Sequence, residues 1–81
     1  MPEVLVRYFA AARQAVGLSE ESLDGTAGLA GILAEVSSRS DQIPPVLARC
    51  SFLVNGLATQ PTSHPLPEGS TVDILPPFAG G

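Results

Sequence analysis

The chain has 81 residues, 44% of them hydrophobic, and its eight acidic side chains against four arginines and no lysine give a formal net charge of −4. This length predicts one domain with a modest core, and the acidic balance argues against a nucleic-acid-binding protein, which needs a basic face. The single cysteine excludes an internal disulfide. Neither a signal peptide nor a membrane span is evident, so we expect a cytoplasmic protein without a membrane or nucleic-acid partner.

The first third of the sequence predicts two strands with a short helix between them. Residues 3–9 are rich in β-branched and aromatic side chains and read as a strand that is apolar except at Arg7. Residues 10–16 favour a helix, which Gly17 would end. A weak alternation over residues 18–23 indicates a short second strand.

The main helix is predicted in the second third of the chain. Asp24-Gly25 is a turn signal, and Thr26 is a candidate helix cap. Apolar residues then follow at the spacing of one helical stripe, at Leu29, Ile32, Leu33 and Val36. Beyond this helix we expect Pro44-Pro45 to break the chain and residues 46–48 to form a single helical turn.

The last third predicts a hairpin and a final strand. Residues 51–54 read as a strand, Asn55-Gly56 as a hairpin turn and residues 57–59 as a short return strand. Residues 70–75 form the final strand, in which Val72 and Ile74 share one face while Asp73 and Leu75 share the other. The expected fold class is α+β, with a mixed sheet that one main helix covers. The first and last strands are the most apolar, so we place them as parallel neighbours at the centre.

The most informative segment is the tail Pro76-Pro77-Phe78-Ala79-Gly80-Gly81, which follows the last strand directly. The two prolines stiffen its base, whereas the two glycines make a narrow, flexible end that can enter a confined active site. Six extended residues reach at most roughly 20 Å. We therefore divide the chain into a domain at 1–75 and an extended tail at 76–81. An inert terminus that happens to end in glycine is the competing interpretation.

These features together resemble the ubiquitin-like sulfur-carrier family (MoaD/ThiS), which has the β-grasp fold. The resemblance spans the chain and is greatest to MoaD-type small subunits of molybdopterin synthase. It rests on residues 4–10 with the Arg13-containing helix, Val54-Asn55-Gly56, His64-Pro65-Leu66 with Glu68-Gly69, and above all the tail.

The resemblance implies a protein substrate more than an enzyme. An ATP-dependent enzyme would adenylate the carboxylate of Gly81, and a sulfur donor would convert it to a thiocarboxylate. The tail would then enter a large, MoaE-type catalytic subunit and supply the sulfur of the molybdopterin dithiolene, in a complex of two small and two large subunits. Gly80 would let the tail thread. No catalytic side chain and no bound cofactor or metal are expected on this chain, and ATP would bind the activating enzyme.

Partner contacts are expected at the tail residues 76–79 and at two apolar side chains of the domain. Leu75 lies on the strand face opposite Val72 and Ile74, and Leu57 lies just beyond the hairpin. Ordinary scattered surface leucine explains both equally well. We expect Arg7 to pair with Asp73, Cys50 to be a small buried hydrophobe, and His64 to be a loop residue without a metal.

Three other functions remain open from the sequence. The sulfur could serve thiamin thiazole, cysteine or tRNA thiolation, since activation would be shared. The protein could be a ubiquitin-like covalent modifier, which the diglycine permits. It could also be a plain β-grasp interaction domain with an inert tail.

Overall fold

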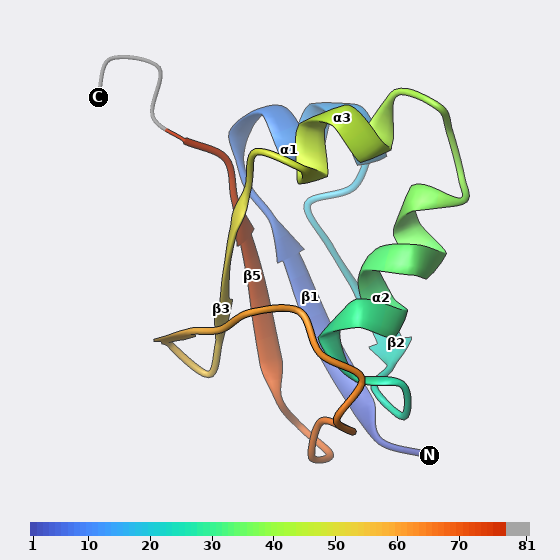
Figure 1. Cartoon of the computed structure of the whole chain (residues 1–81), viewed down its shortest axis with the longest axis vertical. Helices are drawn as coiled ribbons and strands as arrows, with labels where there is room; N and C mark the ends of the chain where they lie inside the picture. The colour runs from blue at the N-terminus through green and yellow to red at the C-terminus, as the bar shows by residue number, and fades with distance from the viewer. Residues whose placement is uncertain (78–81) are drawn as a thin grey trace.

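The computed structural model describes residues 1–77, which form a five-stranded mixed sheet with three helices (Figure 1). The elements follow the order β1 (Glu3–Tyr8), α1 (Ala10–Val16), β2 (Glu20–Asp24), α2 (Gly28–Ser37), α3 (Ile43–Leu47), β3 (Ser51–Val54), β4 (Leu57–Ala58) and β5 (Thr71–Leu75). No helix in residues 1–77 has the length and apolar character needed to cross a membrane.

The first and last strands lie side by side at the centre of the sheet. The strand order is β2-β1-β5-β3-β4, and β1 pairs with β5 in parallel while the other neighbours are antiparallel. The predicted central parallel pair is therefore confirmed. Because β1 and β5 run in the same direction, α1 begins and the C-terminal tail leaves at the same end of the sheet (Figure 1).

One face of the sheet is covered by all three helices and holds the core. Alternate residues of the central strands point into the core, as the period of a half-buried strand requires. The prediction that Val72 and Ile74 share one face of β5, with Asp73 and Leu75 on the other, is confirmed. The fully buried core consists of Val4, Val6, Tyr8, Ala12, Leu29, Ile32, Val36, Ile43, Val72 and Ile74, each at most 1% exposed.

The boundaries of the helices agree with the sequence for α1 and differ from it for α3 and at the start of α2. Gly17 ends α1 with a φ of 87°, in the left-handed region that glycine favours. The predicted break at Pro44-Pro45 is wrong, since both prolines lie in the first turn of α3, where the missing N–H groups would have no helical partner. The predicted helical turn at 46–48 thus lies at 43–47.

The start of α2 also differs from the prediction. Thr26 does not cap the helix; its N–H and hydroxyl both donate to Asp24 Oδ1, at 2.8 and 2.6 Å, and close the turn before it. Ala27 stands at the N-cap position, followed by Gly28 with a φ of 72°. This glycine is required by contact as well as by φ, because a Cβ there would lie 2.5 Å from the carbonyl oxygen of Thr62.

Candidate functional site

The tail leaves the domain from a central strand. β5 ends at Leu75, which is half-buried, as is Pro76, whereas Pro77 is exposed. The remaining predicted site residues Phe78, Ala79, Gly80 and Gly81 lie outside the described residues. The structure therefore fixes where the tail begins: at the end of the sheet where β1 also ends (Figure 1).

The sheet face opposite the helices is here called the open face. By strand register it includes Leu5 and Arg7 of β1, Thr71, Asp73 and Leu75 of β5, Ser51 and Leu53 of β3, and Glu20 and Ser22 of β2. All of these side chains are exposed or half-buried, in contrast to the fully buried residues Val4, Val6, Val72 and Ile74 on the helix face of the two central strands. Within the described chain no element packs over them deeply enough to bury them.

A paired arginine lies in the middle of this open face. Arg7 Nε and Nη2 donate to Asp73 Oδ1 and Oδ2 at 2.6 and 2.9 Å, which is the two-bond fork that suits a carboxylate. The two residues are direct partners in the parallel pairing of β1 with β5, so the predicted pair is confirmed. The hydrogen bond to Asp73 raises the pKa of Arg7.

Apolar side chains border this ion pair on two sides, toward the end of β5 and across β3. The Arg7 guanidinium lies 5.7 Å from the centroid of the Phe9 ring, within the range of a cation–π contact. Leu53 pairs with Asp73 across β3 and β5, and Leu75 follows two residues after Asp73 on the same face. Phe9 and Leu53 were not singled out from the sequence, although the alternation of Leu5, Arg7 and Phe9 could have indicated the first.

Leu57 and Leu75, predicted together as partner contacts, do not share a face. Leu57 is 71% exposed and pairs with Val54, which in turn pairs with Val72 of the helix face. Leu75 lies on the open face and at the other end of β3, where it pairs with Ser51. Leu75 is thus continuous with the tail, and Leu57 belongs to a separate edge of the sheet.

The remaining candidate side chains are consistent with structural roles. Cys50 is half-buried, its thiol donates to the Val46 carbonyl at 3.3 Å, and burial raises its pKa, so the reactive thiolate is disfavoured at neutral pH. His64 is exposed on a loop whose backbone packs against Gly28. In residues 1–77, His, Cys, Asp and Glu side chains form no group of three or more that could hold a metal ion.

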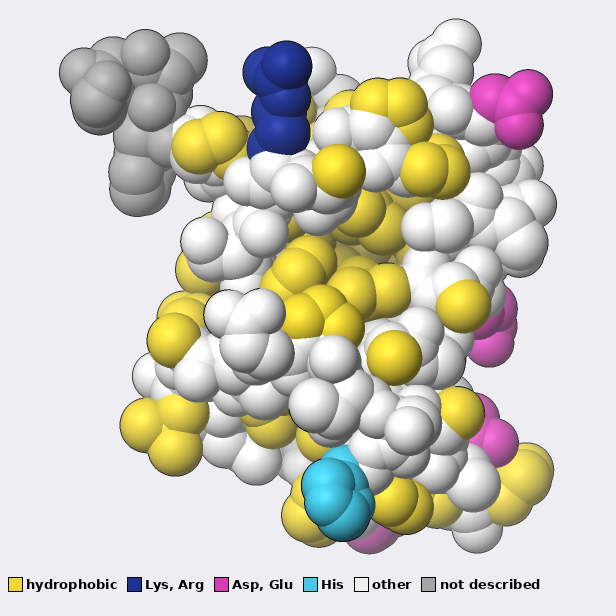
Figure 2. Space-filling view, viewed as in Figure 1, with side chains coloured by type: hydrophobic (Ala, Val, Ile, Leu, Met, Phe, Trp, Pro, Cys, Tyr) yellow, Lys and Arg dark blue, Asp and Glu magenta, His cyan; other side chains and the backbone are white. Residues whose placement is uncertain are grey.

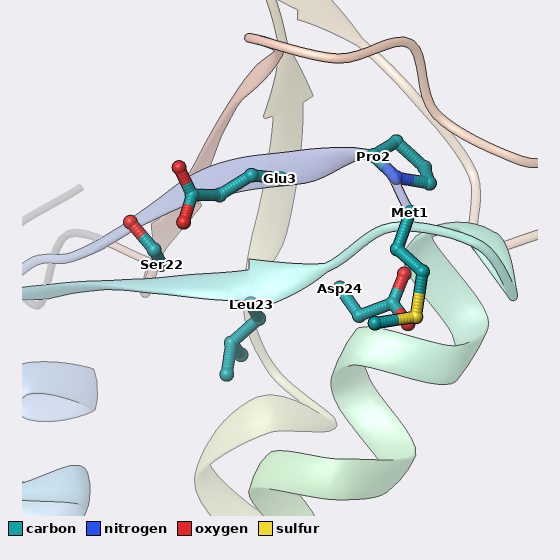
Figure 3. Close-up of a pocket in the computed structure, with 6 residues that line it drawn as sticks. All are labelled: Met1, Pro2, Glu3, Ser22, Leu23 and Asp24. Carbon is teal, nitrogen blue, oxygen red and sulfur yellow. The ribbon is translucent and has the colours of Figure 1, made fainter.

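Two hollows can be described on the surface formed by residues 1–77. One has a volume of about 230 Å³ and lies where β1 begins and β2 ends, lined by Met1, Pro2, Glu3, Ser22, Leu23 and Asp24. In Figure 3, Glu3 and Ser22 point to one side of the strands and Leu23 toward the side of α2. This hollow is at the end of β1 opposite to the tail. In Figure 2, hydrophobic side chains also line a hollow between β3 and the helices, at the margin of the core.

Comparison with known families identifies the fold that carries this tail. The ThiS family model matches residues 6–81, from the first strand through the terminal diglycine. The chain belongs to the ThiS family. The fold is the ubiquitin-like β-grasp, and proteins of this ThiS/MoaD type are sulfur carriers or ubiquitin-like modifiers. No curated protein matches the sequence significantly.

Solved structures resemble this ThiS-family chain over nearly its whole length. A putative molybdopterin converting factor subunit 1 from Pyrococcus furiosus is 26% identical, with a TM-score of 0.80 over 96% of this chain and 100% of that one. Small archaeal modifier protein 1 from Methanosarcina acetivorans is 24% identical, with a TM-score of 0.80 over 100% and 98%. A complex of subunits 1 and 2 of molybdopterin-converting factor from Helicobacter pylori contains a chain 20% identical, with a TM-score of 0.70 over 98% and 99%.

Proposed function

We propose that this protein is a sulfur carrier whose Gly81 carboxylate is converted to a thiocarboxylate that supplies sulfur to molybdopterin. One observation carries the proposal: the ThiS family match continues through Gly80-Gly81, which follow closely on the central strand of a β-grasp domain. The molybdopterin assignment is supported by the Pyrococcus furiosus structure, described as a putative molybdopterin converting factor subunit.

The proposed chemistry uses the main chain of the tail. A Gly81 carboxylate oxygen attacks the α-phosphorus of ATP, pyrophosphate leaves, and an acyl adenylate forms. Hydrosulfide-level sulfur from the donor then attacks the carbonyl carbon, AMP leaves, and loss of the S–H proton gives the thiocarboxylate. Both steps take place in the ATP-dependent activating enzyme, so this chain supplies the carboxylate and binds no cofactor itself. Glycine at positions 80 and 81 puts no side chain beside the reacting carbon.

We further propose that the open face docks on the large, MoaE-type catalytic subunit while the tail enters that subunit's active site. The apolar side chains Phe9, Leu53 and Leu75 lie on the face from which the tail leaves, so one partner can contact both. Complementary support comes from the Helicobacter pylori structure, in which a protein of this fold is in complex with a second subunit. Two copies of each subunit would form the complete synthase.

The direct test is the intact mass of the protein after incubation with the activating enzyme, ATP and the sulfur donor. We expect a gain equal to the replacement of one oxygen by one sulfur, located in the C-terminal peptide. Deletion of Gly81 should abolish the gain, and Gly80→Val should reduce it strongly because the added side chain widens the tail. Ala34→Val, which also enlarges a small residue to valine but at an exposed position of α2, is the control. An unmodified wild-type mass in the presence of active enzymes would refute the carrier function.

A second test concerns the recipient of the sulfur and the docking surface. The thiocarboxylated protein, mixed with the large subunit and the molybdopterin precursor, should form the dithiolene. Leu53→Asp and Leu75→Asp should weaken binding to the large subunit, whereas Leu57→Asp should not if docking uses the open face. Leu57 is 71% exposed and lies on a separate edge of the sheet, on the side of the helix face. Sulfur transfer without dithiolene formation would favour thiazole, cysteine or tRNA thiolation.

A covalent modifier is the second candidate, since a diglycine end can equally form an isopeptide bond with a lysine of another protein. Cells that hold the tail as an isopeptide adduct rather than a thiocarboxylate would favour the modifier. Failure of both forms, together with unimpaired function after Gly80→Val, would favour an interaction domain with an inert tail.

A further inference from the structure

The ion pair of Arg7 and Asp73 lies on the open face, which we propose to dock on the large subunit. Its geometry leaves hydrogen-bond donors of Arg7 accessible to that partner. A guanidinium carries five N–H groups. Asp73 accepts hydrogen bonds from Nε and Nη2, on one side of the guanidinium. The Nη1 group, at the outer end of the side chain, makes no hydrogen bond within residues 1–77. The Arg7 side chain is 44% exposed, against 13% for Asp73. The acceptor of the pair is thus largely covered, while donors remain accessible.

The guanidinium is also held in place before any partner binds. The two-bond fork to Asp73 fixes its plane, and the Phe9 ring lies 5.7 Å from its centre. A free arginine loses considerable side-chain freedom when it is ordered at an interface, but here the loss has already occurred in the folded domain. An ordered arginine with apolar side chains beside it is the kind of residue that dominates binding energy at interfaces.

The charge around Arg7 indicates what kind of group it would bind. Asp73 offsets the positive charge of Arg7, and Glu20 of β2 is its partner on the other side in the strand register. A further carboxylate from the partner would bring a third negative group to one guanidinium, which opposes its binding. A neutral oxygen, such as a main-chain carbonyl, accepts the remaining donors without that repulsion.

We propose that Arg7 is the polar anchor of the open face and donates its free edge to a neutral oxygen of the large catalytic subunit, with Asp73 and Phe9 as positioning residues. This inference rests on the proposed docking of the open face. It assigns Arg7 a role in partner recognition beyond the structural ion pair, since its free donors face outward. Phe9, Leu53 and Leu75 then exclude water around the contact, which strengthens the hydrogen bond.

The test is the dissociation constant of the full chain with the large subunit, measured by calorimetry at low and high salt. Arg7→Leu should raise the constant about tenfold, as loss of a preorganised hydrogen-bond anchor implies, and the increase should persist at high salt. Arg7→Lys should also weaken binding, because an ammonium lacks the fork that serves two acceptors at once. The melting temperature of each variant checks that the domain remains folded.

Arg13→Leu is the matched control, since it removes the same charge from an exposed residue of α1 that lies off the open face. Its binding should stay within twofold of wild type, a limit of about 0.4 kcal/mol. Equal weakening by Arg7→Leu and Arg13→Leu would overturn the proposal, as would unchanged or tighter binding of Arg7→Leu. If the loss of affinity in Arg7→Leu disappears at high salt, the acceptor on the partner is a carboxylate, and the proposed neutral oxygen is wrong. Absence of wild-type binding would instead refute the proposed docking.

Discussion

The hydroxyl of Tyr8 donates a 2.5 Å hydrogen bond to Glu21 Oε2, which joins the buried end of β1 to its neighbour β2. Arg39, just beyond α2, donates to the same carboxylate from Nη1 at 2.6 Å and from Nη2 at 3.0 Å. Glu21 therefore connects both central and edge strands to the segment that follows the main helix. The two partners of Glu21, Tyr8 and Arg39, come from segments far apart in the sequence. Both hydrogen bonds affect how the stability of the domain depends on pH.

The Tyr8 hydroxyl should ionise only at a pH well above that at which an ordinary tyrosine ionises. Burial is the main cause that raises its pKa, and the hydrogen bond to Glu21 adds to it. Because the folded state holds this proton more tightly, the contribution of Tyr8 to stability should be constant below about pH 10 and should fall as the pH rises above it. Tyr8 is the only tyrosine and the chain has no tryptophan, so phenolate absorbance reports it alone. Titration at the ordinary value in the folded protein would contradict the structure.

Replacement of Tyr8 by phenylalanine should cost about 1 kcal/mol of unfolding free energy, the usual contribution of one hydrogen bond. The ring remains to fill the core, and Arg39 still binds Glu21, so no large cavity or unpaired charge results. Urea denaturation at neutral pH measures the change. The variant should also lose stability less steeply than wild type in the alkaline range. A cost near that of a large core truncation would show that the ring position had shifted.

Acid should weaken the fold through Glu21. Burial alone raises the pKa of this carboxyl, but the hydrogen bonds from Arg39 and Tyr8 outweigh burial and lower the pKa below its ordinary value. Its contribution to stability is therefore present above the ordinary range and is lost as the pH falls through the lowered pKa. Denaturation midpoints measured from pH 6 to pH 3 should fall less steeply for Glu21→Gln than for wild type. A slope for Glu21→Gln equal to that of wild type would contradict this prediction.

Substitution of Gly28 by alanine should destabilise the domain by more than about 3 kcal/mol. The residue has a φ of 72°, and the new Cβ would press on the carbonyl oxygens of Thr62 and His64. Gly69→Ala is the control, because Gly69 has a similar φ of 82° but nothing within 4 Å of its Cβ position. It should cost only about 1 kcal/mol from backbone strain. Equal costs in thermal unfolding would show that the contacts at Gly28 relax without penalty.

The absence of lysine predicts the form of any covalent adduct. If the protein acts as a modifier, its own side chains offer no amine for a second copy, so each target lysine should carry a single copy. Denaturing gels of conjugates should show one band shift per modified lysine. Substitution of an exposed arginine, Arg49→Lys, creates a side-chain amine and should permit longer chains. A ladder that forms with the wild-type protein through side-chain branches would contradict this prediction.

Several features of the fold could be predicted from the sequence because they depend on neighbours along the chain. The alternation in residues 70–75 determined which side of β5 is buried, and the stripe at Leu29, Ile32 and Val36 determined the inner face of α2. Glycine at position 17 marked a helix end through its freedom of φ. The terminal diglycine predicted a narrow end that can enter a confined active site without any tertiary information, since two residues without side chains have the same narrow profile in any fold.

Other features were decided only by the tertiary structure, because they depend on register between segments distant in sequence. Leucines 57 and 75 look alike in the sequence, yet pairing of β3 with β4 and β5 places them on opposite sides of the sheet. The register of β3 with β5 brings Leu53 beside Asp73, and the end of β1 brings the Phe9 ring to 5.7 Å from the Arg7 guanidinium. Pro44 and Pro45 are residues that usually break helices, yet here they lie in the first turn of α3. The helix is stabilised there because Ile43 and Leu47 are buried in the core. Packing of distant residues, rather than local preference, decided each of these outcomes.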